Sequence, residues 1–266
     1  MIKCSICKNE KFKLKFHYLK KPNLETNFKI NKKDYERFYI ECKNCFHLFS
    51  LMSFNLENLY LKNYSKLTYG KKILQTFNKI KKLPSKKSDN YYRLKRFIKF
   101  FIEQKKIKSK YLDIGSGTGI FPYSLKENGI NISCIEPDLN LRNHLKKNLS
   151  LRLIANDYNN KNLRSKYDVV SLNKVLEHVK SPKQFLGNIS SVLRNKGFLY
   201  IEVPDAQLAA KKGKNREELF IEHLHGFSKK SLSILLKLNN FKILKIKSII
   251  EPSGKFTLYG FAKKII

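Results

Sequence analysis

The stretch "YLDIGSGTGIF" (residues 111–121) joins a short apolar run, an acid and three closely spaced glycines. A glycine-rich turn after a strand is typical of nucleotide binding. The spacing is Gly115-x-Gly117-x-Gly119, and Ile120 stands where the dinucleotide fingerprint has its third glycine. No Lys-Ser or Lys-Thr pair follows, so the usual phosphate loop is absent. Asp113 disfavours a bound phosphate and suits a ligand that carries an ammonium group.

Acids also follow the next two expected strands. Glu136 ends "ISCIE" 21 residues after Gly115, where a carboxylate can accept both ribose hydroxyls of a nucleoside. Asp157 follows "LIAN", where it can bind an adenine amino group, and Tyr158 can cover the ring. Together these residues outline an adenosine joined to an amino acid.

Strands and helices alternate from residue 110 onward. We expect strands near residues 110–114, 131–136, 151–154, 167–172 and 197–203, with helices at about 119–128, 138–148 and 182–194. This alternation predicts an α/β fold with a mostly parallel sheet and helices on both faces. A further helix in "SKKSLSILLKLN" and two strands around "EPSG" predict a C-terminal antiparallel hairpin. Before the glycine turn, "NYYRLKRFIKFFIEQKKI" has apolar residues at helical spacing.

The ordered set "DIGSGTG", Glu136, "NDY" and "YDVVSLNKVLEHV" resembles the class I S-adenosylmethionine-dependent methyltransferases over about residues 90–266. The resemblance implies a Rossmann-like, doubly wound fold with a seven-stranded sheet. It implies that Asp113 and the backbone of 115–119 hold the methionine part, with Asn173 beside it. The cofactor-binding residues expected are Asp113, Gly115, Ser116, Gly117, Gly119, Glu136, Pro137, Asp157, Tyr158 and Asn173.

Four of the five cysteines lie in two C-x-x-C pairs near the N-terminus: Cys4, Cys7, Cys42 and Cys45. Four thiolates are a tetrahedral zinc set with no open position, so we expect a structural metal. Disulfides are disfavoured in a reducing compartment, and a redox motif needs only one pair. Cys134 lies inside an expected strand and is expected to be an inert core residue.

These patterns together predict three parts of the chain: a zinc-binding module (1–60), a basic helical connector (61–108) and a methyltransferase domain (109–266).

A four-Cys module before this domain resembles the sugar C-methyltransferases that act on nucleotide-linked deoxysugars, although their further C-terminal domain has no counterpart in these 266 residues. "FIEHLHGFS" resembles their "E-H-x-x-Y-F-S" stretch, in which a His is the general base. The resemblance makes His223 the first candidate base and His225 the second, unless both only brace the segment. Gly226 replaces the Tyr of that stretch.

His178 in "LEHV" is a third candidate near the cofactor. Quinone-type O-methyltransferases have a Glu-x-x-Glu-His here that can bind a divalent metal. Lys174 replaces the first of those acids, so we expect no catalytic metal. Glu177 and His178 are expected to form the acceptor site or, alternatively, a structural hydrogen-bonding pair.

The formal net charge of +34 comes from 55 cationic residues, of which only eight are Arg. Guanidinium is the preferred group for phosphate and base contacts, so codon bias towards Lys competes with an anionic partner as the explanation. The chain has no apolar run of about 18 residues and no apolar region at its start, which favours the cytoplasm and leaves peripheral membrane contact open.

We expect methyl transfer from S-adenosylmethionine to a sugar, free or nucleotide-linked, or a related small metabolite, in surface-polysaccharide biosynthesis. An RNA methyltransferase and a non-catalytic cofactor-binding subunit are the alternatives.

Overall fold

The computed structural model describes residues 3–52, 65–156 and 166–265. Its main sheet has seven strands in the order β10-β11-β8-β7-β4-β5-β6. The strands are β4 (Tyr111–Ile114), β5 (Ile132–Ile135), β6 (Arg152–Ala155), β7 (Tyr167–Asn173), β8 (Leu193–Pro204), β10 (Phe241–Ile250) and β11 (Phe256–Lys264). Strands β6, β5, β4, β7 and β8 run parallel, and β11 pairs antiparallel with both β8 and β10. The doubly wound sheet with an antiparallel C-terminal hairpin is therefore confirmed.

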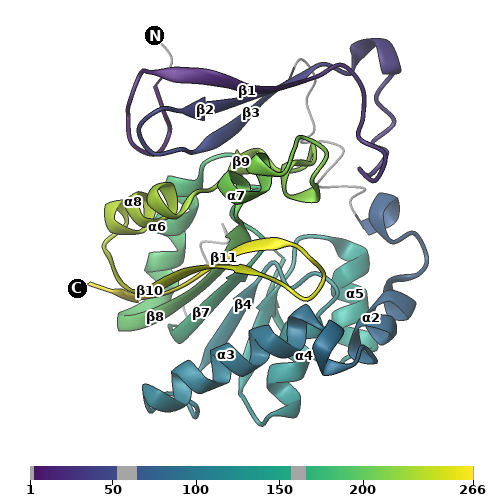
Figure 1. Cartoon of the computed structure of the whole chain (residues 1–266). Helices are drawn as coiled ribbons and strands as arrows, with labels where there is room; N and C mark the ends of the chain where they lie inside the picture. Colours follow the sequence, from purple (N-terminus) through teal and green to yellow (C-terminus); the bar gives the residue numbers. More distant parts are fainter. Residues whose placement is uncertain (1–2, 53–64, 157–165, 266) are drawn as a thin grey trace.

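Helices cover both faces of this sheet (Figure 1). They are α2 (Ile73–Lys81), α3 (Asp89–Glu103), α4 (Ile120–Glu127), α5 (Leu139–Lys147), α6 (Pro182–Val192), α7 (Ala206–Lys211) and α8 (Lys229–Leu238), with short 3-10 helices η1 (Lys32–Asp34), η2 (Ser85–Lys87) and η3 (Glu217–Leu219). One core packs α6 and α8 against Leu112 and Leu172, and a second packs α3 and α4 against Tyr111 and Val169. Strands β4 and β7 are thus buried on both sides, which explains their nearly continuous apolar sequences.

The expected amphipathic helix before the glycine turn is α3. Ser88 caps its start by accepting a hydrogen bond from the backbone N–H of Tyr91. Phe97 and Phe101 are fully buried in the second core. This helix, which the sequence analysis places in a connector, therefore packs as part of the main domain.

A second, smaller sheet has the order β1-β2-β3-β9. Its N-terminal strands are β1 (Phe12–Tyr18), β2 (Arg37–Cys42) and β3 (Leu48–Met52), and all of its pairings are antiparallel. The fourth strand, β9 (His225–Gly226), comes from the segment between β8 and α8. In Figure 1 strands β1, β2 and β3 lie above the main sheet, with β9 and α7 between these strands and the main sheet. The first and last predicted domains therefore share a sheet, and the division at residues 60 and 108 remains a proposal.

Candidate active site

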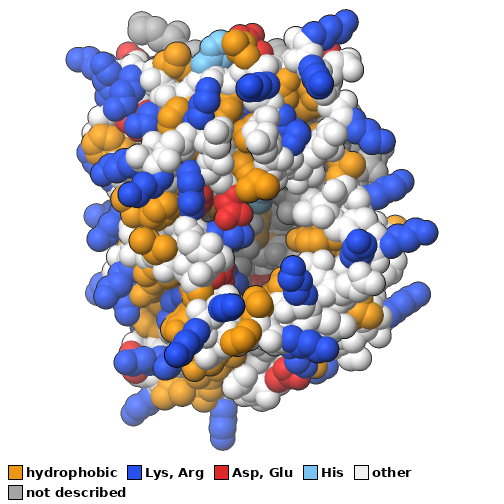
Figure 2. Space-filling view, turned by 45° about the vertical axis from the view of Figure 1, so that its right-hand side comes forward, with side chains coloured by type: hydrophobic (Ala, Val, Ile, Leu, Met, Phe, Trp, Pro, Cys, Tyr) orange, Lys and Arg blue, Asp and Glu red, His pale blue; other side chains and the backbone are white. Residues whose placement is uncertain are grey.

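The site begins where the chain leaves β4. From β4 the chain continues to β5 and β6 on one side of the sheet, and it later returns to β7 and β8 on the other. In such sheets the ligand crevice lies at the carboxyl ends of the strands, at the point where the order reverses. Figure 2 shows a hollow on one face of the molecule, with acidic and histidine side chains at its edge.

The glycine turn presents its backbone to this crevice. Gly115, Gly117 and Gly119 all have left-handed φ angles, of 71°, 54° and 77°. A Cβ added at Gly117 would meet no atom within 4 Å, whereas one at Gly115 would lie 2.6 Å from Cγ2 of Val175. Gly117 therefore faces open space, whereas the missing side chain at Gly115 lets Val175 pack closely against the turn. Helix α4 begins directly after the turn, so its N-terminal N–H groups also lie at this end of the sheet.

Asp113 lies at the base of the turn, and its side chain is almost fully buried. Its Oδ1 accepts hydrogen bonds from Ser171 Oγ at 2.6 Å and Asn173 Nδ2 at 3.2 Å. Burial raises the pKa of Asp113 to about 6. The Oδ1 of Asn173 is buried without a hydrogen-bond partner among the described residues. An ammonium group would supply the missing donors, so these side chains fit the methionine end of S-adenosylmethionine.

Glu136 holds the glycine turn in place. Its Oε2 accepts from Gly117 N at 2.7 Å, and its Oε1 accepts from Asp138 N at 3.0 Å. Burial raises the pKa of Glu136 to about 7. Each carboxylate oxygen has a second lone pair, which leaves capacity for ribose hydroxyls. Ser116 and Pro137 flank this pair in the chain, and Ser116 is buried whereas Pro137 is exposed. Asp157 and Tyr158 lie outside the described residues.

Glu177, His178 and His223, which the sequence analysis expects on the acceptor side, form one cluster whose potential ligand atoms lie within 4.8 Å of one another. Both carboxylate oxygens of Glu177 and the Nδ1 of His223 are buried without hydrogen-bond partners in the described chain. His178 Nδ1 lies 2.8 Å from the carbonyl oxygen of Glu222 and must donate to it, because a carbonyl only accepts. This tautomer leaves the lone pair of His178 on Nε2.

Burial sets the protonation of this cluster. It raises the pKa of Glu177 to about 8, lowers that of His178 to about 4 and lowers that of His223 well below its usual range. The imidazoles are therefore neutral at pH 7 and able to accept a proton. The three side chains could hold a metal, but the positive charge of Lys174 also acts on Glu177 and His223, which disfavours a cation there.

His225 has a different environment. Its Nδ1 lies 3.0 Å from Nε2 of His47, and its Nε2 lies 3.4 Å from the carbonyl oxygen of Lys180. Because both ring nitrogens have partners, the bracing role fits His225 better than the role of base. The structure brings two of the three candidate bases together, His178 and His223.

Sequence reasoning missed a buried ionic network beside the crevice. Glu202, at the end of β8, accepts from Arg93 Nε at 2.7 Å and from Arg96, which also contacts Glu251 Oε1 at 2.9 Å. Burial opposes ionisation, but the two guanidinium groups outweigh it and lower the pKa of Glu202 to about 2. Lys174, next to this network, has a φ of 57°, which is strained for a residue other than Gly. The scarcity of Arg in so Lys-rich a chain is the signal that could have found these residues.

The four N-terminal cysteines form one cluster. Cys4 Sγ lies 3.7 Å from Cys45 Sγ, Cys7 Sγ lies 3.5 Å from Cys42 Sγ, and all four sulfurs lie within 4.8 Å of one another. A zinc ion with Zn–S bonds of about 2.3 Å separates its sulfurs by about 3.8 Å. The donor set and its spacing therefore fit zinc. Cys134 is fully buried on β5, as expected.

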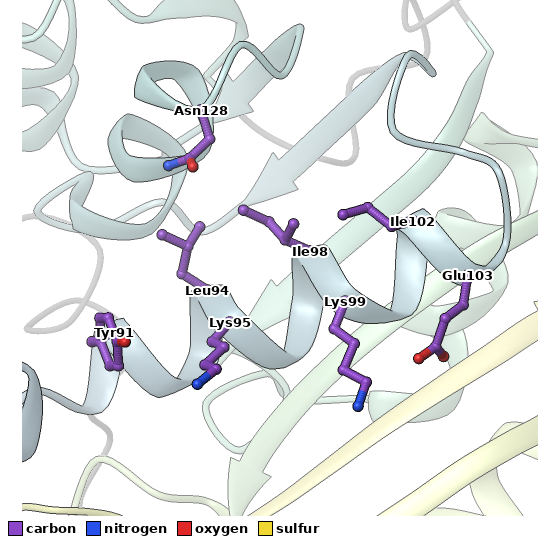
Figure 3. A pocket seen from close by; sticks show the side chains of 8 residues that line it. All are labelled: Tyr91, Leu94, Lys95, Ile98, Lys99, Ile102, Glu103 and Asn128. Carbon is purple, nitrogen blue, oxygen red and sulfur yellow. The ribbon is translucent and has the colours of Figure 1, made fainter.

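Two shallow depressions flank α3 and lie apart from the histidine cluster. Figure 3 shows one of them, with Leu94, Ile98 and Ile102 in a row along the helix and Lys95 and Lys99 on another side of it. The second depression also includes Lys95 and Lys99. Neither contains Asp113, the glycine turn or a histidine, so we assign neither to cofactor or acceptor.

A doubly wound sheet with an open glycine turn and a buried acid at the base of that turn is typical of a cofactor-binding α/β fold. The family described as "Methyltransferase domain" matches residues 87–246. The chain therefore belongs to this family, and it is an S-adenosylmethionine-dependent methyltransferase.

Solved structures share the fold at low identity. Magnesium protoporphyrin IX methyltransferase from Synechocystis, solved with S-adenosylhomocysteine, is 12% identical with a TM-score of 0.59, covering 78% of this chain and 100% of its own. The 1,6-didemethyltoxoflavin-N1-methyltransferase from Burkholderia thailandensis is 13% identical with a TM-score of 0.56, covering 86% of this chain and 96% of its own. A methyltransferase from Methanosarcina mazei is 17% identical with a TM-score of 0.52, and the match covers 62% of this chain and 97% of its own. No curated protein matches the chain.

Among the described helices, none has both the length and the apolar character needed to cross a membrane.

Proposed function

We propose that the protein transfers a methyl group from S-adenosylmethionine to a small metabolite, namely a sugar, free or nucleotide-linked, in surface-polysaccharide biosynthesis. The resemblance of the four-Cys module and of "FIEHLHGFS" to sugar methyltransferases supports the sugar class. A small acceptor also agrees with the Burkholderia thailandensis enzyme, which was solved with 1,6-didemethyltoxoflavin bound. The Lys and Arg side chains in Figure 2 are spread over the face and do not gather in one patch, which gives no support to an RNA substrate.

The observation that carries the proposal is the buried Nδ1 of His223, which has no hydrogen-bond partner among the described residues. An acceptor hydroxyl can donate its proton to this nitrogen while its oxygen attacks the methyl carbon in line with the sulfonium. The new C–O bond forms as the methyl–sulfur bond breaks, the electron pair stays on sulfur, and His223 takes the proton. His178, whose ring centroid lies 4.9 Å from that of His223, lines the same site.

The cofactor would be held by Asp113 and Asn173 at its ammonium group, by Ser116 and the glycine-turn backbone along its methionine part, and by Glu136 with Pro137 at its ribose. Asp157 and Tyr158 would complete the adenine end. The four cysteines would hold a structural zinc ion, because a closed thiolate set has no position for a substrate.

The test combines cofactor binding with turnover. Isothermal titration should show S-adenosylmethionine binding to the wild type, and a panel of nucleotide-linked deoxysugars should release S-adenosylhomocysteine. We expect His223→Gln to lower kcat by about 10²–10⁴-fold without changing cofactor affinity. His225→Gln is the matched control, since its ring nitrogens already have partners, and it should keep most of the turnover. Full turnover in His223→Gln would remove His223 as the base, and cofactor binding without turnover on any sugar would favour a non-catalytic subunit.

A further inference from the structure

The N-terminal module bonds the segment that carries His223 at several points. At its start, Arg37 Nη1 donates to the carbonyl oxygen of Leu219 at 2.9 Å, and Ile221 N donates to Glu25 Oε2 at 2.6 Å. Arg37 and Glu25 form an ion pair at 3.2 Å, and both side chains are fully buried. A buried ion pair thus fixes the entry of this segment into the acceptor site.

The N-terminal module also contacts His223 itself. Tyr39 is fully buried, and its hydroxyl donates to the carbonyl oxygen of His223 at 2.5 Å. The next residue is held as well, because Ser50 N donates to the carbonyl oxygen of Leu224 at 3.0 Å. The peptide groups on the carboxyl side of the proposed base are therefore bonded to strands β2 and β3.

The end of the segment reaches the second C-x-x-C pair. His225 pairs with Phe49 in the β3–β9 ladder, and its ring contacts that of His47. Ser228 Oγ donates to the carbonyl oxygen of Cys45 at 2.6 Å. The sheet that holds His223 thus ends directly at the four-Cys cluster.

We infer that the N-terminal module is a wall of the acceptor site, with Tyr39, Arg37 and Glu25 as positioning residues that set His223 against Glu177 and His178. The inference rests on the proposed function, in which His223 is the base. A catalytic group must be held to within about 0.5 Å of its productive position, and a fully hydrogen-bonded strand pairing provides such rigidity. The four-Cys cluster then supports catalysis at a distance, by fixing the end of the sheet that positions the base.

Two tyrosines offer a matched pair of variants. Tyr18 and Tyr39 are both buried, both pack against Arg37, and each donates a hydrogen bond of 2.5 Å to a backbone carbonyl of the segment between β8 and α8. The Tyr39 hydroxyl also lies 3.4 Å from the carbonyl oxygen of Phe220 in the same segment. Tyr18 bonds Lys214, however, which lies outside the acceptor cluster, whereas Tyr39 bonds His223. Replacing each tyrosine by Phe removes the same chemical group at two different distances from the base.

Hydrogen–deuterium exchange and histidine NMR give readouts that do not need the acceptor. In Tyr39→Phe we expect amides of residues 219–226 to exchange about tenfold faster, since an internal hydrogen bond contributes roughly that factor to an equilibrium constant. The NMR-measured pKa of His223 should rise towards its ordinary value as the ring becomes better solvated, because burial is what lowers it. In Tyr18→Phe both quantities should stay at their wild-type values. With a sugar acceptor in hand, Tyr39→Phe should lower kcat with little change in KM.

The outcomes separate the two proposals. If Tyr39→Phe and Tyr18→Phe give the same exchange rates and the same pKa for His223, the positioning role is wrong, even where His223→Gln abolishes turnover. If His223→Gln keeps full turnover, the proposed base is wrong, whatever the tyrosine variants show. If cofactor binding weakens in Tyr39→Phe, the module acts on the whole domain and not on the acceptor side, which also contradicts the inference.

Discussion

Replacing Arg37 by Met tests how strongly the buried ion pair supports the fold. The substitution keeps an unbranched apolar stem but leaves the Glu25 carboxylate buried without its ion-pair partner. Breaking a buried ion pair from one side typically costs about 3–5 kcal/mol. Glu25 keeps hydrogen bonds from Tyr35 Oη and Ile221 N, both at 2.6 Å, so we expect the lower value of about 3 kcal/mol.

A loss of this size should be visible in both urea and thermal unfolding. For a chain of this length, about 3 kcal/mol corresponds to a fall in Tm of roughly 6–12 °C. The double variant Arg37→Met with Glu25→Gln should recover part of the loss, because the amide needs no counter-charge. The difference between the single and double variants measures the coupling of the pair.

The pH dependence gives a second, independent check. Burial raises the pKa of Glu25, and Arg37 opposes this rise, so removing Arg37 raises the pKa further. The folded variant then keeps its proton over a range in which the unfolded chain, with a pKa of about 4.3, has lost it. Stability should therefore fall as the pH rises above about 4.3, and more steeply in the variant than in the wild type. A cost below about 1 kcal/mol with no added pH dependence would refute the reasoning.

Three further predictions concern the cofactor, the metal and the glycine turn. Asp113→Asn should weaken S-adenosylmethionine binding about 10–100-fold in isothermal titration, since it removes a charged acceptor of the ammonium group, and an unchanged Kd would contradict that role. Cys42→Ser should lower the bound zinc measured by mass spectrometry and lower Tm, whereas Cys134→Ser, on β5, should leave the zinc content unchanged. Gly115→Ala should destabilise the protein by about 1–3 kcal/mol more than Gly117→Ala in urea unfolding, because only its Cβ meets Val175, and equal costs would contradict the packing.

The main sheet could be predicted because its signals are local. The four residues of β4 are all buried, and the sequence shows this as a short apolar run that ends in the glycine turn. Asp113, Glu136 and Asn173 each belong to or follow one strand, so strand order alone brings them to the same edge. No longer-range information was needed to bring these three side chains to one edge of the sheet.

The acceptor side depends on contacts that no local pattern encodes. Strand β9 has two residues, too few for any alternation, and its pairing with β3 joins positions more than 170 residues apart. The β3–β9 register decides that His225 faces His47, while His223 lies with Glu177 and His178. The sequence could therefore rank His223 before His225 only through the resemblance, because no local pattern encodes these contacts.

The arginines show how the charge of this chain should be interpreted. Lysine outnumbers arginine 47 to 8, so most positions that only need a solvated cation carry Lys. Arg37 is fully buried, and Arg93 and Arg96 have side chains no more than 15% exposed, each in an ion pair with a buried glutamate. A planar guanidinium can satisfy such partners with several fixed donors, whereas an ammonium group would be desolvated at greater cost. These three arginines therefore serve buried ion pairs inside the fold, and a net charge of +34 that comes mostly from Lys is not in itself evidence for a nucleic-acid partner.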